Sequence, residues 1–197
     1  MSLMPCFQPD QAFNEGVVLG RILAGYGELE LTMCECLIET KRLMNANILD
    51  LPIRDIFGKR GAEQRIKIAK KSLLAEYTKA NLQTELIETL DDMEWCRLIR
   101  NQYAHCHWYW TQQEGLCFVN LEELAEQPSA ILELMGNRHP IDVPLLFAQE
   151  SFLNYVKESF THLASAYRAW NQTRAALRPS IYIFPKPSKI ARPLRHR

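Results

Sequence analysis

Three residue types suited to phosphate chemistry stand close together in the segment RLIRNQYAH, residues 97–105. Arg100 carries a permanently charged guanidinium, whose planar fork of N–H donors matches the oxygens of a phosphate. His105, five positions later, titrates near neutral pH and can exchange protons with oxygen atoms. Asn101 follows the arginine directly. These residues suit metal-free cleavage of an RNA phosphodiester, which needs a proton-transfer group and positive charge beside the phosphate.

The element that must position these residues is a helix predicted from about Leu82 to His105. Its apolar residues recur at three- and four-residue steps, as on one buried face: Leu86, Ile87, Leu90, Met93, Leu98 and Ile99. On an ideal helix Asn101 and His105 share a face, whereas Arg100 lies well round the cylinder from His105. The three side chains therefore converge only if the helix frays near Ala104 or the long arginine reaches across.

The Arg-Asn-x3-His pattern of residues 100–105 resembles the signature of the HEPN superfamily. Two upstream features are similar to the first and middle helices of such domains: Tyr26-Gly27-Glu28-Leu29-Glu30, and a predicted helix with several Lys and Arg residues from Gln64 to Ala75. The resemblance spans about residues 15 to 112. It implies an all-helical bundle in which Arg, a polar neighbour and His line a cleft that cuts RNA without a metal. It also implies a homodimer, because two domains of this superfamily usually pair so that their motifs face one cleft.

The motif and the resemblance together predict three groups of site residues. The predicted catalytic residues are Arg100, Asn101 and His105. Three residues beside them are predicted to bind substrate: Arg97, Tyr103 and His107. From the first helix, Glu28 or Glu30 is predicted to orient Arg100 or His105, although such carboxylates are more often simply solvated.

Two alternatives to a nuclease site stay open. In the first, Arg97, Arg100 and Asn101 only cap or bridge the helix end, where cations complement the helix dipole. His105 would then stack under Trp108 as a structural residue. In the second, the chain keeps the scaffold but binds instead of cutting, as a regulatory module for RNA, a nucleotide or a protein partner such as an antitoxin. A nuclease of this kind would act as a toxin or a defence component.

No metal site and no other cofactor are predicted. The segment HCH at 105–107, with Cys96, offers suitable ligand types, but no second closely spaced ligand pair lies nearby. Cys34 and Cys36 point to opposite sides of a helix. The six cysteines are expected to be free, mostly buried thiols, because no secretory signal is recognised. We also expect a cytoplasmic protein without a membrane segment, because no apolar stretch approaches the length of a span.

The fold class predicted for this chain is all-α. With 197 residues, 47% of them apolar, it is long enough for one good core and short for two. We predict a HEPN-like bundle of four to five main helices, as a single domain over residues 1–177, with a small hairpin insertion at about 107–119. Besides the motif helix, the predicted helical segments are 10–45 with a break or a close crossing near Gly25 to Gly27, a short turn from Pro52 to Gly58, 62–77, 121–126 and 146–176.

Residues 178–197 are predicted to form a Pro-rich basic tail, because four prolines forbid a regular helix there. From Ser159 onward the chain carries eight Lys or Arg residues and no Asp or Glu. We therefore expect an extended tail that is mobile, held by a partner, or in contact with phosphate.

Overall fold

The computed structural model describes residues 12–41, 50–59, 61–121, 125, 138–175 and 185–196. Within these residues the chain is mostly helical and carries one small antiparallel sheet, which confirms the prediction of a helical bundle with a hairpin. The elements are α1 (Phe13–Lys41), α2 (Asp50–Phe57), α3 (Ala62–Lys79), α4 (Gln83–Ala104), β1 (Cys106–Thr111), β2 (Gly115–Asn120), β3 (His139–Pro140) and α7 (Val143–Ala175). The predicted short helix at 121–126 lies largely outside the described residues.

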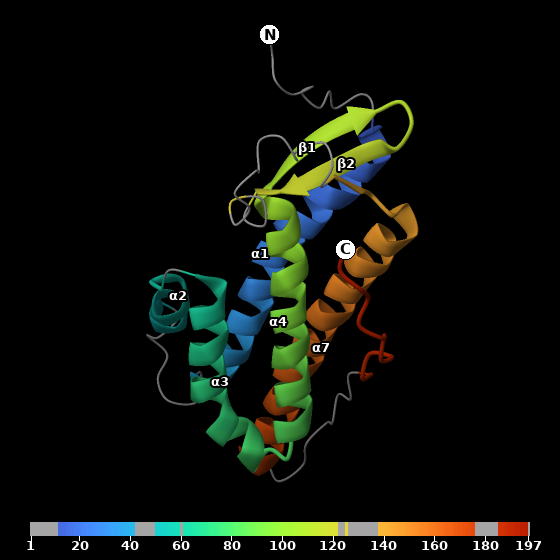
Figure 1. The fold of residues 1–197 in the computed structure, drawn as a ribbon. Helices are drawn as coiled ribbons and strands as arrows, with labels where there is room; N and C mark the ends of the chain where they lie inside the picture. The colour runs from blue at the N-terminus through green and yellow to red at the C-terminus, as the bar shows by residue number, and fades with distance from the viewer. Residues whose placement is uncertain are drawn as a thin grey trace.

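The two longest helices, α1 and α7, run parallel and form the spine of the bundle (Figure 1). Three ion pairs join them at a constant separation of 129 residues along the chain: Arg21 with Glu150, Glu28 with Lys157 and Glu39 with Arg168. The constant separation means that both helices advance in the same direction at the same rate. Helix α4 then runs antiparallel to both, so its C-terminal end lies beside their N-terminal ends (Figure 1).

Helix α1 is continuous where the glycines predicted either a break or a close crossing. At Gly25, a Cβ atom would lie 3.1 Å from Cδ2 of Leu153 on α7. The close crossing is therefore what the structure contains, and the predicted alternative of a break is wrong. Each glycine costs a helix up to about 1 kcal/mol against alanine. Burial of the α1 face against α7 outweighs that cost.

The core forms where α1, α3, α4 and α7 meet. Large apolar side chains from each helix are fully buried there, among them Ile22, Leu29, Leu73, Leu86, Met93, Phe152 and Phe160. The five described cysteines are free thiols, and four of them are buried. None of the described helices is long and apolar enough to cross a membrane.

The hairpin follows directly from α4. Strands β1 and β2 pair antiparallel, with Trp108 opposite Phe118 and Thr111 opposite Gly115. Gly115 has a φ of +73°, a left-handed conformation that glycine adopts without steric cost. A third strand, β3, pairs with β2 where only irregular chain was predicted. Two residues carry no periodicity that a sequence could reveal, and the proline in β3 lies at an edge, where it needs no partner for a missing N–H.

The described part of the tail, residues 185–196, has no regular secondary structure and lies against α4 and α7. Nε1 of Trp95 donates a hydrogen bond to the Pro193 carbonyl at 2.9 Å, and Nε2 of Gln149 donates one to the Leu194 carbonyl at 2.8 Å. Arg192 forms an ion pair with Asp92 of α4 at 2.6 Å. These residues of the tail therefore bind their own bundle, which the sequence did not predict.

Candidate functional site

The motif occupies the last turn of α4 and its C-cap. The helix continues through Ala104, and His105 leaves it with φ −114° and ψ 30°. The backbone N–H of His105 still donates to the Asn101 carbonyl at 3.3 Å. The helix therefore does not fray before Ala104, and β1 begins immediately after the cap.

Arg100 and Asn101 are brought together by a direct hydrogen bond. Nη1 of Arg100 donates to Oδ1 of Asn101 at 3.1 Å, and both side chains are half-buried. Among the described residues, no carboxylate lies within ion-pair distance of Arg100. An amide oxygen is neutral, so this bond holds the guanidinium in place without compensating its charge. Arg100 thus combines a fixed position with a free positive charge.

His105 is exposed and lies one turn beyond Asn101. Its backbone carbonyl accepts a hydrogen bond from the N–H of Leu121 at 3.2 Å. Within the described part of the chain, its imidazole has no hydrogen-bond partner. It is not stacked under Trp108, whose ring packs against Tyr103 and Phe118 with centroid distances of 5.9 and 5.5 Å. The imidazole is therefore open to solvent.

The neighbouring Arg97 differs from Arg100 in its partner. Nε of Arg97 donates to both carboxylate oxygens of Glu94, at 2.9 Å each. This hydrogen bond raises the pKa of Arg97, because the carboxylate stabilises the charged guanidinium. A phosphate that bound Arg97 would have to compete with Glu94.

Tyr103 lies in the core rather than on the surface of the motif, with an exposed fraction of 1%. Its hydroxyl hydrogen-bonds to Gln149 of α7 and lies 2.6 Å from Nδ1 of His196 in the tail. Burial raises the pKa of Tyr103, so the phenol is neutral.

His107, on β1, is half-buried. Its Nε2 atom is buried without a hydrogen-bond partner among the described residues. Its ring stacks on Tyr109 with a centroid distance of 6.5 Å. Backbone direction changes between the helix cap at His105 and the strand, so the two histidines stand on different elements.

Both acidic candidates on α1 contact other helices. Glu28 pairs with Lys157 of α7 at 2.8 Å, and this hydrogen bond lowers the pKa of Glu28. Glu30 is buried and pairs with Arg65 of α3 at 2.7 Å. No contact of either carboxylate with Arg100 or His105 occurs among the described residues.

His196 of the tail contacts the motif helix, and sequence reasoning did not single it out. Its backbone exchanges two hydrogen bonds with the Gln102 side chain, at 2.6 and 3.2 Å. Its Nε2 accepts the backbone N–H of Asp142 at 2.9 Å, which requires a neutral imidazole. Burial lowers the pKa of His196 in agreement with that role. No local sequence signal links two segments so far apart along the chain.

Metal ligands do not gather in the described parts of the chain: no group of three or more His, Cys, Asp or Glu residues there could hold a metal ion. No family model, curated protein or solved structure matches this chain.

Proposed function

We propose that the protein is a metal-independent endoribonuclease of the HEPN type, with Arg100, Asn101 and His105 as its catalytic residues. The observation that carries the proposal is the end of α4. There the guanidinium of Arg100, which forms no ion pair with the described residues, is hydrogen-bonded to Asn101, and Asn101 lies one turn before the exposed imidazole of His105. The resemblance of the motif to the HEPN signature supports the same assignment. The proposal places the enzyme in the cytoplasm.

In the proposed reaction, a neutral His105 takes the proton from a ribose 2′-hydroxyl. The 2′-oxygen attacks phosphorus, the bond to the 5′-oxygen breaks, and a 2′,3′-cyclic phosphate forms. Arg100 stabilises the negative charge that builds on the phosphate, and this kind of stabilisation is often the largest catalytic contribution. Asn101 holds the guanidinium. The leaving 5′-oxygen needs a proton from a second group, and a second copy of the motif across a homodimer would supply it.

A second candidate function is a non-catalytic module that binds RNA, a nucleotide or a protein partner. One observation favours it: two of the residues predicted to bind substrate contact other side chains instead. Arg97 pairs with Glu94, and Tyr103 contacts Gln149 and His196. If the remaining motif residues only bind, Arg100 would contact a ligand phosphate and His105 would transfer no proton.

The proposal is tested by incubating the purified protein with total RNA in EDTA. The variants Arg100→Ala and His105→Ala are compared with Arg21→Ala and His162→Ala, which remove the same residue types from other helices. Cleavage by the parent and both controls, with loss in both motif variants, supports a metal-independent nuclease. No cleavage above the background of the motif variants would favour the binding module.

The biological side of the proposal is a toxin or defence role. Overexpression of the parent chain in a bacterial host is expected to suppress growth, because uncontrolled RNA cleavage stops translation. The His105→Ala chain, expressed to the same level, should restore growth. Equal growth suppression by both chains would contradict this role.

A further inference from the structure

Helices α2 and α3 lie side by side at the edge of the bundle (Figure 1). An open groove of about 680 Å³ runs along them. Arg54 and Lys59 line it from α2 and the residues after it, and Lys71 and Ser72 line it from α3. All four are exposed.

The cations of this groove form no ion pair with any residue that the structure describes. Most lysines and arginines of the described chain form ion pairs. Those without an ion pair among the described residues are Arg54, Lys59, Lys71, Arg100, Lys189 and Arg195. Half of this set lines a single groove. The one carboxylate that also lines it, Asp55, is neutralised by Lys41 at 3.1 Å.

Hydrogen bonds define the backbone at the end of α2, where Arg54 and Lys59 stand. The N–H of Gly58 donates to the Arg54 carbonyl at 2.9 Å, and a Cβ atom at Gly58 would lie only 2.5 Å from that oxygen. The carbonyl of Lys59 accepts a hydrogen bond from Nε of Arg65 at 3.2 Å. Ile56 is fully buried and anchors α2 to the bundle. The groove is therefore lined by two helices and by the hydrogen-bonded turn that ends α2.

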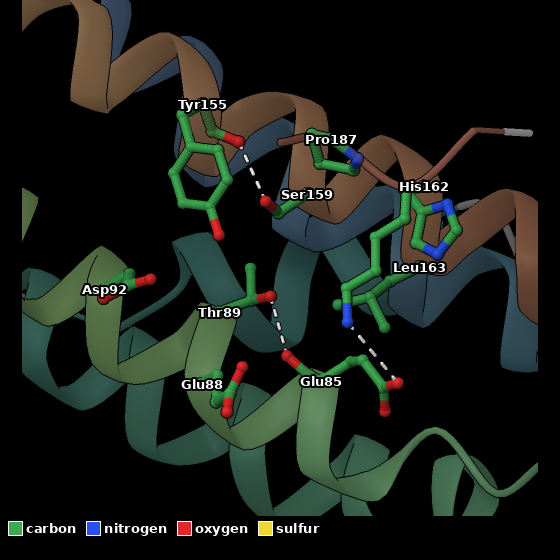
Figure 2. Close-up of a pocket in the computed structure, with 10 residues that line it drawn as sticks. Glu85, Glu88, Thr89, Asp92, Tyr155, Ser159, His162, Leu163 and Pro187 are labelled. Atoms are coloured by element: carbon green, nitrogen blue, oxygen red, sulfur yellow. Dashed lines mark hydrogen bonds and ion pairs between the residues drawn. The ribbon is translucent and has the colours of Figure 1, made fainter. Parts of the chain in front are cut away.

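A second pocket, between α4, α7 and the tail, has the opposite character. Glu85, Glu88 and Asp92 of α4 face Tyr155 and the other α7 side chains across it (Figure 2). Tail cations already occupy two of these carboxylates, through Lys186 with Glu85 and Arg192 with Asp92. The cations at this pocket are therefore engaged by carboxylates, whereas the three cations of the α2–α3 groove form no ion pair with the described residues.

The groove and the motif belong to neighbouring helices. Helix α3, which lines the groove, packs against α4, and the motif lies at the C-terminal end of α4. Lys70 of α3 forms an ion pair with Asp91 of α4 at 4.0 Å.

We propose that the groove between α2 and α3 binds the phosphodiester backbone of the RNA that the motif cleaves, an inference that rests on the proposed function. Arg54, Lys59 and Lys71 supply the charge, and the Ser72 hydroxyl supplies a hydrogen bond. Among the residues that the structure describes, no aromatic side chain lines the groove. Stacking on bases is therefore absent from this contact, and recognition is of the backbone and independent of sequence.

The test separates binding from cleavage. The probe is a fluorescein-labelled RNA of about 20 nucleotides, longer than a typical single-strand site, with every 2′-hydroxyl methylated so that it cannot be cleaved. Fluorescence anisotropy measures its Kd for the full chain. The groove variant combines Arg54→Gln, Lys59→Gln and Lys71→Gln. The matched control combines Arg21→Gln, Lys67→Gln and Lys79→Gln, which removes the same charge from ion-paired surface cations.

The Kd of the groove variant for this RNA is expected to be at least about tenfold higher than that of the parent at moderate salt. In a plot of log Kd against the logarithm of the salt concentration, its slope should be shallower by about 2. The control should bind like the parent. Equal binding by the groove variant and the control would overturn the inference, even if unmodified RNA is cleaved. The inference would also be overturned if the groove variant lost binding to acidic phospholipid vesicles but bound RNA like the parent. If the parent does not cleave unmodified RNA and only the groove variant loses RNA binding, the proposed nuclease function would be rejected and the groove would stand as an RNA-binding site.

Discussion

At the scale of single residues, the two arginines of the motif segment differ in the side chain that each one contacts. Arg97 is neutralised by Glu94, whereas Arg100 is held by the neutral amide of Asn101. The contact between Arg100 and Asn101 is short-range, so a sequence can suggest it, and Glu94 stands at the i,i+3 spacing that forms helix ion pairs. Tyr103 follows Ile99 by four residues on the buried stripe of α4, so periodicity could have predicted its burial. Its partners Gln149 and His196 could not be predicted, because they lie far away along the chain.

The neutrality of the residue beside Arg100 can be tested directly. Asn101→Asp would keep the size of the side chain but place a carboxylate against the guanidinium, so the charge available to a phosphate would fall. We expect the initial rate of RNA cleavage in EDTA to drop by about 100-fold, as on loss of one charge-stabilising group. Arg97→Gln should leave the rate close to that of the parent. A rate for Asn101→Asp equal to that of Arg97→Gln would contradict the role given to Arg100.

At the scale of elements, periodicity predicted the helices and the hairpin because each is defined by contacts within one segment. The motif helix, α3 and α7 end within a few residues of their predicted limits. The parallel seam of α1 and α7 depends instead on pairs 129 residues apart. The attachment of the tail depends on contacts such as Gln149 with Leu194, 45 residues apart, and Asp92 with Arg192, 100 residues apart. No local pattern encodes such partners, which is why the tail was expected to be free or held by another molecule.

The glycines of α1 give a paired test of the seam. A side chain at Gly25 meets Leu153, whereas a side chain at Gly20 meets nothing within 4 Å. Gly25→Leu should lower the free energy of unfolding by about 1–3 kcal/mol through overpacking. Gly20→Leu should raise it by up to about 1 kcal/mol, because leucine is the better helix former. Urea unfolding followed by circular dichroism measures both, and equal effects at the two positions would contradict the close crossing.

The attachment of the tail should depend on pH through His196. Its Nε2 accepts the Asp142 N–H, so protonation removes that bond, and burial lowers the pKa of His196 below its ordinary value of about 6.5. Asp142 opposes this shift, and His139 adds to it. Because the pKa is lowered in the folded state, the stability from the attached tail is present above about pH 6.5 and is lost as the pH falls further.

Thermal unfolding between about pH 5 and 8, where an ordinary histidine titrates, measures this effect. The Tm of the parent should fall on the acid side. The His196→Gln variant should have a lower Tm than the parent near neutral pH, and its Tm should fall less as the pH is lowered. The same acid dependence in both chains would show that His196 is not its source.

At the scale of the whole molecule, the charges fall into distinct regions. Tail cations pair with acidic side chains of α4, whereas three cations of the α2–α3 groove and Arg100 form no ion pair with the described residues. The net charge of zero conceals this arrangement. We therefore expect a polyanion to bind at the groove and the motif.

The measurement that tests the central claim most directly is the chemistry of the new RNA ends. A defined RNA with one 2′-O-methyl group at a mapped cleavage position is digested in EDTA, and the products are identified by mass spectrometry. Cleavage through His105 predicts 2′,3′-cyclic phosphate ends at every unmodified position, none at the methylated one, and no products from His105→Ala. Products with 3′-hydroxyl ends, or cleavage at the methylated position, would contradict attack by the 2′-oxygen and with it the proposed role of the motif.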